Sequence, residues 1–101
     1  MTVQGAKNDF LNGEYTKSTN VNGKPAYFRS DKKYGIWFND FENYPVWIVE
    51  EKNELNGGKF TYGILYGKGD TNCPNELTEW REKHDGEWKD NEDFTIGTVQ
   101  F

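Results

Sequence analysis

The chain has 101 residues, the length of one domain, and its net charge of −5 excludes the basic face that generic nucleic-acid binding requires. Its single cysteine excludes an intramolecular disulfide, and no apolar run approaches the ~20 residues of a membrane span. The polar first fifteen residues lack the apolar segment of a signal peptide, so the compartment stays unknown. We therefore expect a soluble, acidic single domain that contacts neither nucleic acid nor membrane.

Residues 1–9 are small and polar, which predicts a frayed N-terminus before a single β domain over residues 10–101. Turn dipeptides then alternate with aromatic blocks, and these dipeptides tolerate the positive φ of two-residue hairpin turns. They are Asn12-Gly13, Asn22-Gly23, Asn56-Gly57 and Asp85-Gly86. The pattern predicts an all-β fold, a small antiparallel sandwich or barrel of about six to seven short strands.

In chain order, strands are expected over Glu14–Lys17, 25–30, Tyr34–Asn39, Val46–Glu51, Lys59–Gly67 and Phe94–Phe101. Val46–Glu51 is apolar on both faces, which indicates a central strand with Val46 and Ile48 opposite Trp47 and Val49. The glycines of Lys59–Gly67 indicate a bulge or a close approach of another backbone segment. At most one short helix is expected, near 75–83, where Leu77, Trp80 and Arg81 lie three and four residues apart.

The seventeen aromatic residues outnumber the thirteen Ile, Leu and Val residues. We expect most of them to form the core and some to be exposed for binding. A flat aromatic ring beside polar side chains can hold the apolar C–H face of a sugar ring. The sequence therefore predicts a non-catalytic recognition module for a protein or carbohydrate partner. The predicted ligand-binding residues are Trp37, Phe41, Tyr44, Trp47 and Tyr66.

Three other functions stay open. A small hydrolase would use carboxylates such as Glu50 and Glu51, although no catalytic residue is assigned. A calcium-stabilised structural domain would use the oxygen-rich loops, those of Asp70 with Asn72 and of Asp85–Asp93. Self-association would pair an uncovered strand such as Lys59–Gly67 with a second copy. His84 is the only histidine, and no His/Cys spacing supplies a zinc site, so no metal ligand and no cofactor is assigned.

An ordered set of motifs also spans residues 12–88. It resembles an aromatic-rich repeat module of many predicted proteins from protists and marine eukaryotes, with the pattern NGxY…NGxPxY…W-I…P…W…GxW. That family has no agreed activity, so the resemblance assigns no site residue, and it implies a binding or structural module rather than an enzyme. The single copy departs from the tandem arrangement of the family. The motifs are Asn12-Gly13-Glu14-Tyr15, Asn22-Gly23-Lys24-Pro25-Ala26-Tyr27, Ile36-Trp37-Phe38, Trp47-Ile48-Val49, Tyr62, Cys73-Pro74, Trp80 and Asp85-Gly86-Glu87-Trp88.

Overall fold

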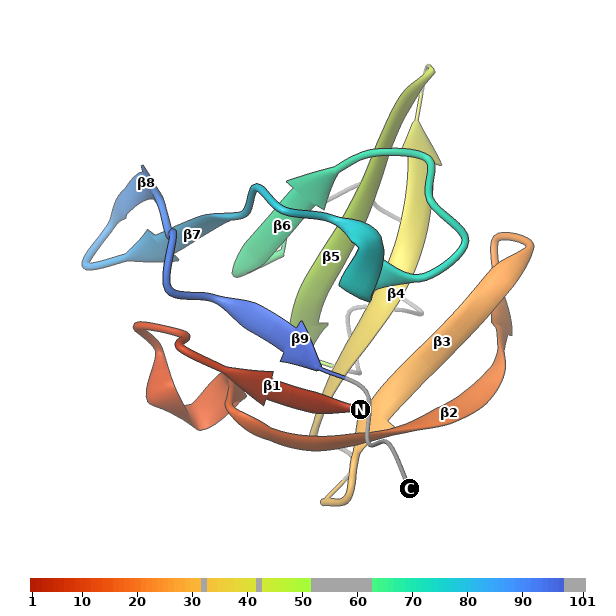
Figure 1. Ribbon diagram of the computed structural model, residues 1–101, viewed down its shortest axis with the longest axis horizontal. Coiled ribbons are helices and arrows are strands. Elements are labelled where there is room, and N and C mark those ends of the chain that lie inside the picture. The colour runs from red at the N-terminus through yellow and green to blue at the C-terminus, as the bar shows by residue number, and fades with distance from the viewer. Residues whose placement is uncertain (32, 42, 52–62, 98–101) are drawn as a thin grey trace.

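The computed structural model describes residues 1–31, 33–41, 43–51 and 63–97, with the side chain of Phe41 outside that description. Within these residues, nine strands form one antiparallel sheet that curls into a half-barrel (Figure 1). The order across the sheet is β8-β7-β6-β5-β4-β3-β2-β1-β9. The strands are β1 (Thr2–Gln4), β2 (Gly13–Val21), β3 (Lys24–Arg29), β4 (Tyr34–Phe41), β5 (Tyr44–Glu51), β6 (Leu65–Lys68), β7 (Arg81–His84), β8 (Glu87–Asp90) and β9 (Thr95–Gly97). The described residues also form two short 3-10 helices, η1 (Asp9–Leu11) and η3 (Pro74–Glu76).

The predicted all-β antiparallel class is confirmed, but the predicted number of strands was too low. The additional strands β1, β7 and β8 are only three or four residues long, and polar residues dominate β7 and β8. Strands this short carry little alternating pattern. Strand β1 pairs with β9 from a distant part of the sequence, whereas β7 and β8 pair with each other as a hairpin. Of the strand predicted over Lys59–Gly67, residues 63–67 are described: Gly63 and Ile64 precede β6, and the last three residues belong to it. Residues 98–101 of the last predicted strand lie outside the described ranges.

The N-terminus differs from the frayed segment that the sequence predicts. Strand β1 lies between β2 and β9, where Val3 pairs with Gly13 on one side and Ile96 on the other (Figure 1). The side chain of Val3 is 1% exposed, and the N-terminal amine donates a hydrogen bond to the carbonyl of Tyr15 (3.1 Å). Burial of this one apolar side chain and pairing on both edges offset the entropy of ordering the segment.

The sequence allows at most one short helix near 75–83, and the structure has only a 3-10 turn at its start. The single 3-10 turn η3 is followed by an extended segment and then by β7. Leu77 and Trp80 pack over Gly67 of β6, where a Cβ would lie 2.8 Å from Leu77 Cδ1 and 3.0 Å from Trp80. The apolar spacing therefore reflects a segment that packs over the sheet, and the close approach at Gly67 is made by the side chains of Leu77 and Trp80 rather than by another backbone segment.

Two predicted hairpin turns are present with the backbone that two-residue turns require. Asn22 and Gly23 connect β2 to β3 with φ values of 54° and 84°, and Asp85 and Gly86 connect β7 to β8 with φ values of 53° and 79°. Positive φ at both central residues is the type I′ geometry that fits the twist of a hairpin. Asn56-Gly57 lies outside the described residues.

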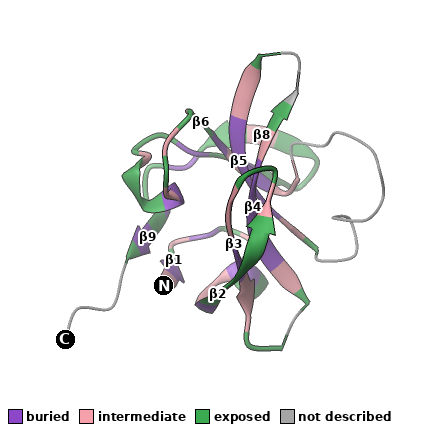
Figure 2. Cartoon of the chain, turned by 90° about the vertical axis from the view of Figure 1, so that its right-hand side faces the viewer, coloured by how far each residue is buried: buried purple, intermediate pink, exposed green. Residues whose placement is uncertain are grey.

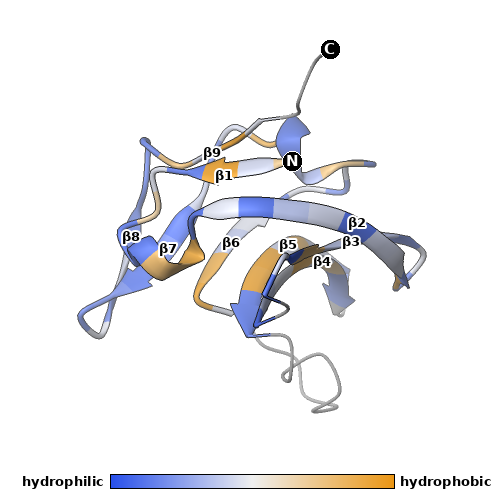
Figure 3. Ribbon diagram, turned by 90° about the horizontal axis from the view of Figure 1, so that it is seen from below, coloured by the Kyte–Doolittle hydropathy of each residue, from blue (hydrophilic) through white to orange (hydrophobic). Residues whose placement is uncertain are grey.

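The central strands carry apolar residues on both faces of the sheet, as the sequence predicts for Val46–Glu51. Trp47 and Val49 belong to the main core on the inner face, whereas Val46 and Ile48 belong to a second cluster with Trp37 and Ala26. Buried residues concentrate in β4 and β5 (Figure 2), and β5 carries one of the longer hydrophobic stretches (Figure 3). The sheet thus presents two surfaces, and the outer one holds the candidate site.

Candidate functional site

Of the five predicted ligand-binding residues, two are buried in the core, two line a groove together, and one has a side chain outside the described atoms. Trp47 is fully buried in the main core and Trp37 is 3% exposed in the second cluster, so neither ring offers the open face that a ligand-binding aromatic needs. The indole N–H of Trp47 donates to Oγ1 of Thr71 (3.1 Å), which fixes it as an internal residue. The side chain of Phe41 lies outside the described atoms. Tyr44 and Tyr66 are half-buried and line one groove together.

Strand register explains why Tyr66 meets charged side chains. Ile48 of β5 pairs with Tyr66 of β6, Tyr66 pairs with Arg81 of β7, and Arg81 pairs with Asp90 of β8. Directly paired residues of neighbouring strands point to the same face of a sheet. The outer face therefore changes from apolar to aromatic to charged as it passes from β5 to β8.

The groove has a volume of about 230 Å³ and is lined by six residues, Tyr44, Tyr66, Lys68, Glu79, Arg81 and Asp90. Its two cations and two carboxylates balance in formal charge. The ammonium of Lys68 lies 4.4 Å from the ring centroid of Tyr44, which covers one face of that ring. The ring of Tyr66 makes an edge contact with Trp88 of β8, with centroids 5.2 Å apart and planes at 70°.

The charged side of the groove is held loosely. Nε of Arg81 lies 3.3 Å from Oδ1 of Asp90, with side chains 48% and 81% exposed. Ion pairs this exposed contribute little to stability, so this one can rearrange toward a ligand at small cost. Nη2 of Arg81 also donates to the carbonyl of Trp88 (3.4 Å). Glu79 is exposed and has no hydrogen-bond or ion-pair partner among the described residues.

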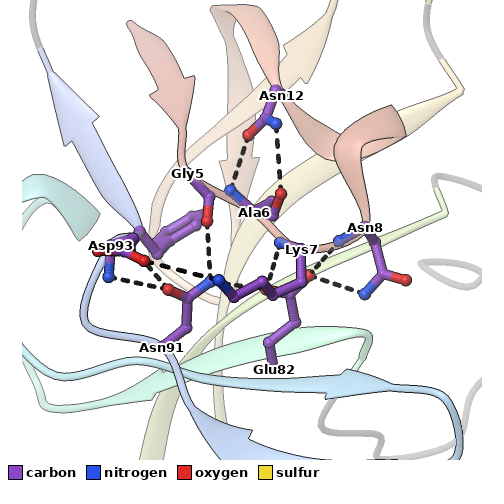
Figure 4. Close-up of polar contacts among 9 residues, drawn as sticks. Gly5, Ala6, Lys7, Asn8, Asn12, Glu82, Asn91 and Asp93 are labelled. Carbon is purple, nitrogen blue, oxygen red and sulfur yellow. Dashed lines mark hydrogen bonds and ion pairs between the residues drawn. The ribbon is translucent and has the colours of Figure 1, made fainter.

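The opposite face of the β7–β8 hairpin carries a buried carboxylate that the sequence analysis missed. Glu82 is 2% exposed and accepts four hydrogen bonds (Figure 4). The donors are the backbone N–H groups of Lys7 (2.8 Å) and Asn8 (2.7 Å) and the side-chain amides of Asn8 (2.7 Å) and Asn91 (2.7 Å). Four donors fill the acceptor sites of a carboxylate, so the hydrogen-bonding capacity of this buried group is satisfied within the protein. No local pattern signals it, because its partners are up to 75 residues away.

Asn91 connects this network to Gly5 and to the two residues Asp93 and Phe94. Its amide nitrogen donates to the carbonyl of Gly5 (2.9 Å) as well as to Glu82 (2.7 Å). Its side-chain oxygen accepts from the backbone N–H groups of Asp93 (2.9 Å) and Phe94 (3.1 Å) (Figure 4). We call Glu82, Asn91 and the segment of residues 5–8 the N-terminal clamp.

The residues considered for metal binding or catalysis are dispersed. His84 ends β7 at the hairpin, with Nδ1 3.5 Å from Oδ2 of Asp85 and about half of its side chain exposed. Within the described ranges, no three or more His, Cys, Asp and Glu residues gather as a metal site. Glu50 and Glu51 end β5, where the backbone N–H of Glu51 donates to Oε1 of Glu50 (2.9 Å). The hydrolase and calcium alternatives stay predictions.

Burial in the core shifts the pKa of two tyrosines, and a surface ion pair shifts the pKa of Asp31. Burial raises the pKa of Tyr15, whose hydroxyl donates to the carbonyl of Leu11 (2.7 Å). Burial, followed by the neighbouring Cys73, raises the pKa of Tyr27. The guanidinium of Arg29 is the largest cause that lowers the pKa of Asp31 to about 2.

Comparison with protein families, with curated protein sequences and with solved structures gave no match. The resemblance to aromatic-rich repeat modules therefore stays a prediction. No helix in the described part of the chain is long and apolar enough to cross a membrane. A functional proposal has to rest on the groove itself.

Proposed function

We propose that this chain is a non-catalytic carbohydrate-binding module whose site is the groove between Tyr44, Tyr66 and the β7–β8 hairpin. The observation that carries the proposal is the pair of half-buried tyrosines beside Glu79, Arg81 and Asp90 in one groove. Aromatic rings with a few polar groups at their side are the usual elements of a small-ligand site. The resemblance to a binding or structural module points in the same direction.

The size and charge of the groove favour a sugar over a protein partner. Its 230 Å³ is less than the ~300–1,000 Å³ of pockets that enclose a drug-sized ligand, which suits one ring of a longer chain. The centre of a protein interface is normally depleted of charged residues, whereas four of the six groove residues are charged. The balance of two cations and two carboxylates favours a neutral sugar.

Each part of the groove has a role in this proposal. The ring of Tyr66 packs against the apolar C–H face of the sugar. Glu79 and Asp90 accept hydrogen bonds from sugar hydroxyls, and Arg81 donates to hydroxyl or ring oxygens. The exposed Arg81–Asp90 pair exchanges part of its mutual contact for contacts with the sugar.

The test is titration of the wild-type chain with cellohexaose, chitohexaose, mannohexaose and maltohexaose, followed by calorimetry and by two-dimensional NMR. At least one hexaose should bind and shift the indole signal of Trp88, which contacts Tyr66. Glu79→Ala and Arg81→Ala should each weaken binding about fivefold or more, the equivalent of about one lost hydrogen bond of ordinary net strength.

The matched control is Phe10→Ala. Phe10 is 44% exposed and packs against Tyr34, away from the groove, so its removal should leave the affinity unchanged. Failure of all four hexaoses to bind contradicts the proposal. Binding that survives Glu79→Ala and Arg81→Ala but is lost in Phe10→Ala places the site elsewhere and also contradicts it.

A further inference from the structure

We propose that Glu82 is a positioning residue for the groove, because the N-terminal clamp fixes the hairpin that presents Arg81 and Asp90 to the ligand. This inference rests on the proposed function and adds a role for residues 5–8, which do not line the groove. In this inference the buried carboxylate does not contact the ligand; it acts through the hairpin backbone on the groove residues of the opposite face.

Strand alternation connects the clamp to the groove. Arg81 and Glu82 are consecutive in β7, so their side chains point to opposite faces of the sheet. On the other side of the hairpin, Asp90 is followed directly by Asn91, whose amide donates to Glu82 (2.7 Å). The two groove residues and the two clamp residues are therefore neighbours along the same two backbone segments. A shift in the clamp moves the backbone from which the groove residues project.

The hairpin has few other attachments. Strand β8 is at the edge of the sheet, and β7 pairs with β6 through two residue pairs in the described part of the chain, Leu65↔Glu82 and Tyr66↔Arg81. The backbone N–H of Lys83 also donates to the carbonyl of Ile64 (2.8 Å). Short edge strands with so few ladder bonds open at low free-energy cost.

The clamp supplies a second attachment on the inner face. Besides the bonds to Glu82, the amide of Asn8 donates to the carbonyl of Lys83 (2.8 Å), and Asn91 donates to the carbonyl of Gly5 (2.9 Å). The N-terminal segment thus contacts β7 at Glu82 and Lys83 and also contacts Asn91, the residue that follows β8 (Figure 4). Fixing a polar group in its binding geometry before the ligand arrives lowers the cost of binding.

The test uses Asn8→Ala and Glu82→Gln in the whole chain. Asn8→Ala removes one bond to Glu82 and the bond to the carbonyl of Lys83, and it keeps both backbone donors. Glu82→Gln places an amide donor against other donors. Two readouts follow, namely the NMR signals of Arg81 Nε–H and Trp88 Nε1–H in the free protein, and the affinity for the four hexaoses named above.

Two controls separate positioning from stability. Val3→Ala removes buried apolar surface from β1 and takes away no hydrogen-bonding group of the clamp. It should lower the free energy of unfolding as much as the clamp variants do, while leaving both groove signals in place. Lys7→Ala removes an exposed side chain that pairs with Asp93 (3.6 Å) but keeps the backbone donor to Glu82. Both controls should retain wild-type affinity under conditions where they are fully folded.

We expect Asn8→Ala and Glu82→Gln to shift both groove signals more than Val3→Ala does, and to lower the affinity about five- to tenfold. Unchanged groove signals in folded Asn8→Ala and Glu82→Gln would overturn the inference. If no hexaose binds the wild-type chain, the proposed function fails, and the signals of the free protein still decide whether the clamp positions the groove.

Discussion

Replacing Glu82 with leucine tests whether polar contacts or apolar burial decides stability at this position. Glu82 is 2% exposed and pairs with the fully buried Leu65, so burial alone favours leucine. The carboxylate, however, is the acceptor for the backbone N–H groups of Lys7 and Asn8. In Glu82→Leu these two donors lose that partner inside a partly buried site.

The magnitude follows from the individual contacts. Each of the two orphaned N–H groups costs about 1–3 kcal/mol. The amides of Asn8 and Asn91 lose a charged acceptor but keep the carbonyls of Lys83 and Gly5, so they add less. Burial of the leucine side chain returns about 1.5–3 kcal/mol. We expect a net loss of about 2 kcal/mol in the free energy of unfolding, or about 8–16 °C in Tm for a domain of this size.

Urea unfolding followed by Trp fluorescence measures this change. The control is Glu87→Leu in β8 of the same hairpin, where the side chain is 70% exposed and pairs with Lys89 across 3.4 Å. This control should change stability by less than about 0.5 kcal/mol. A Glu82→Leu chain as stable as the wild type, or more stable, would refute the reasoning that the hydrogen bonds outweigh apolar burial here.

Three further predictions test the fold. Gly67→Ala should cost about 1–3 kcal/mol in urea unfolding because its Cβ would meet Leu77 and Trp80, whereas Gly97→Ala, with open space around its Cβ, should be close to neutral. Tyr15→Phe should cost about 1 kcal/mol. Because burial raises the pKa of Tyr15 above 10, its contribution is complete below pH 10 and is lost as the pH rises further, so wild-type stability should fall more steeply there than that of Tyr15→Phe. Asp31, with a pKa lowered to about 2, contributes fully above pH 4 and loses its contribution as the pH falls through 2, so Asp31→Asn should flatten the acid side of the urea-midpoint profile.

Local patterns in the sequence were sufficient for several parts of the fold. Asn22-Gly23 and Asp85-Gly86 form hairpin turns because the positive φ that these dipeptides tolerate is decided within two residues. The two apolar faces of Val46–Val49 follow from the alternation of side chains along a strand. Both inferences need no knowledge of what lies across the sheet.

Other features depend on partners that no local pattern contains. The segment near 75–83 has helical spacing, but Trp80 is buried against the sheet, and Glu82 accepts hydrogen bonds from residues 7 and 8. The candidate site was predictable only in part for the same reason. Tyr44 and Tyr66 line the groove, whereas Trp37 and Trp47 are buried by strands on either side of them, and side-chain type alone cannot separate these two outcomes.

Both faces of the sheet change from apolar to charged at the same place, between β6 and β7. The hairpin β7–β8 is therefore attached to the domain mainly by polar contacts and short ladders, while β3 to β6 are fixed by burial. Polar contacts contribute less per residue than core packing, but they specify direction, because donors and acceptors must meet at defined geometry. This makes the hairpin the part of the described chain where a change on the inner face most readily alters the groove on the outer face. The inner row is Ile36, Val49, Leu65, Glu82 and Lys89, and the outer row is Trp37, Ile48, Tyr66, Arg81 and Asp90.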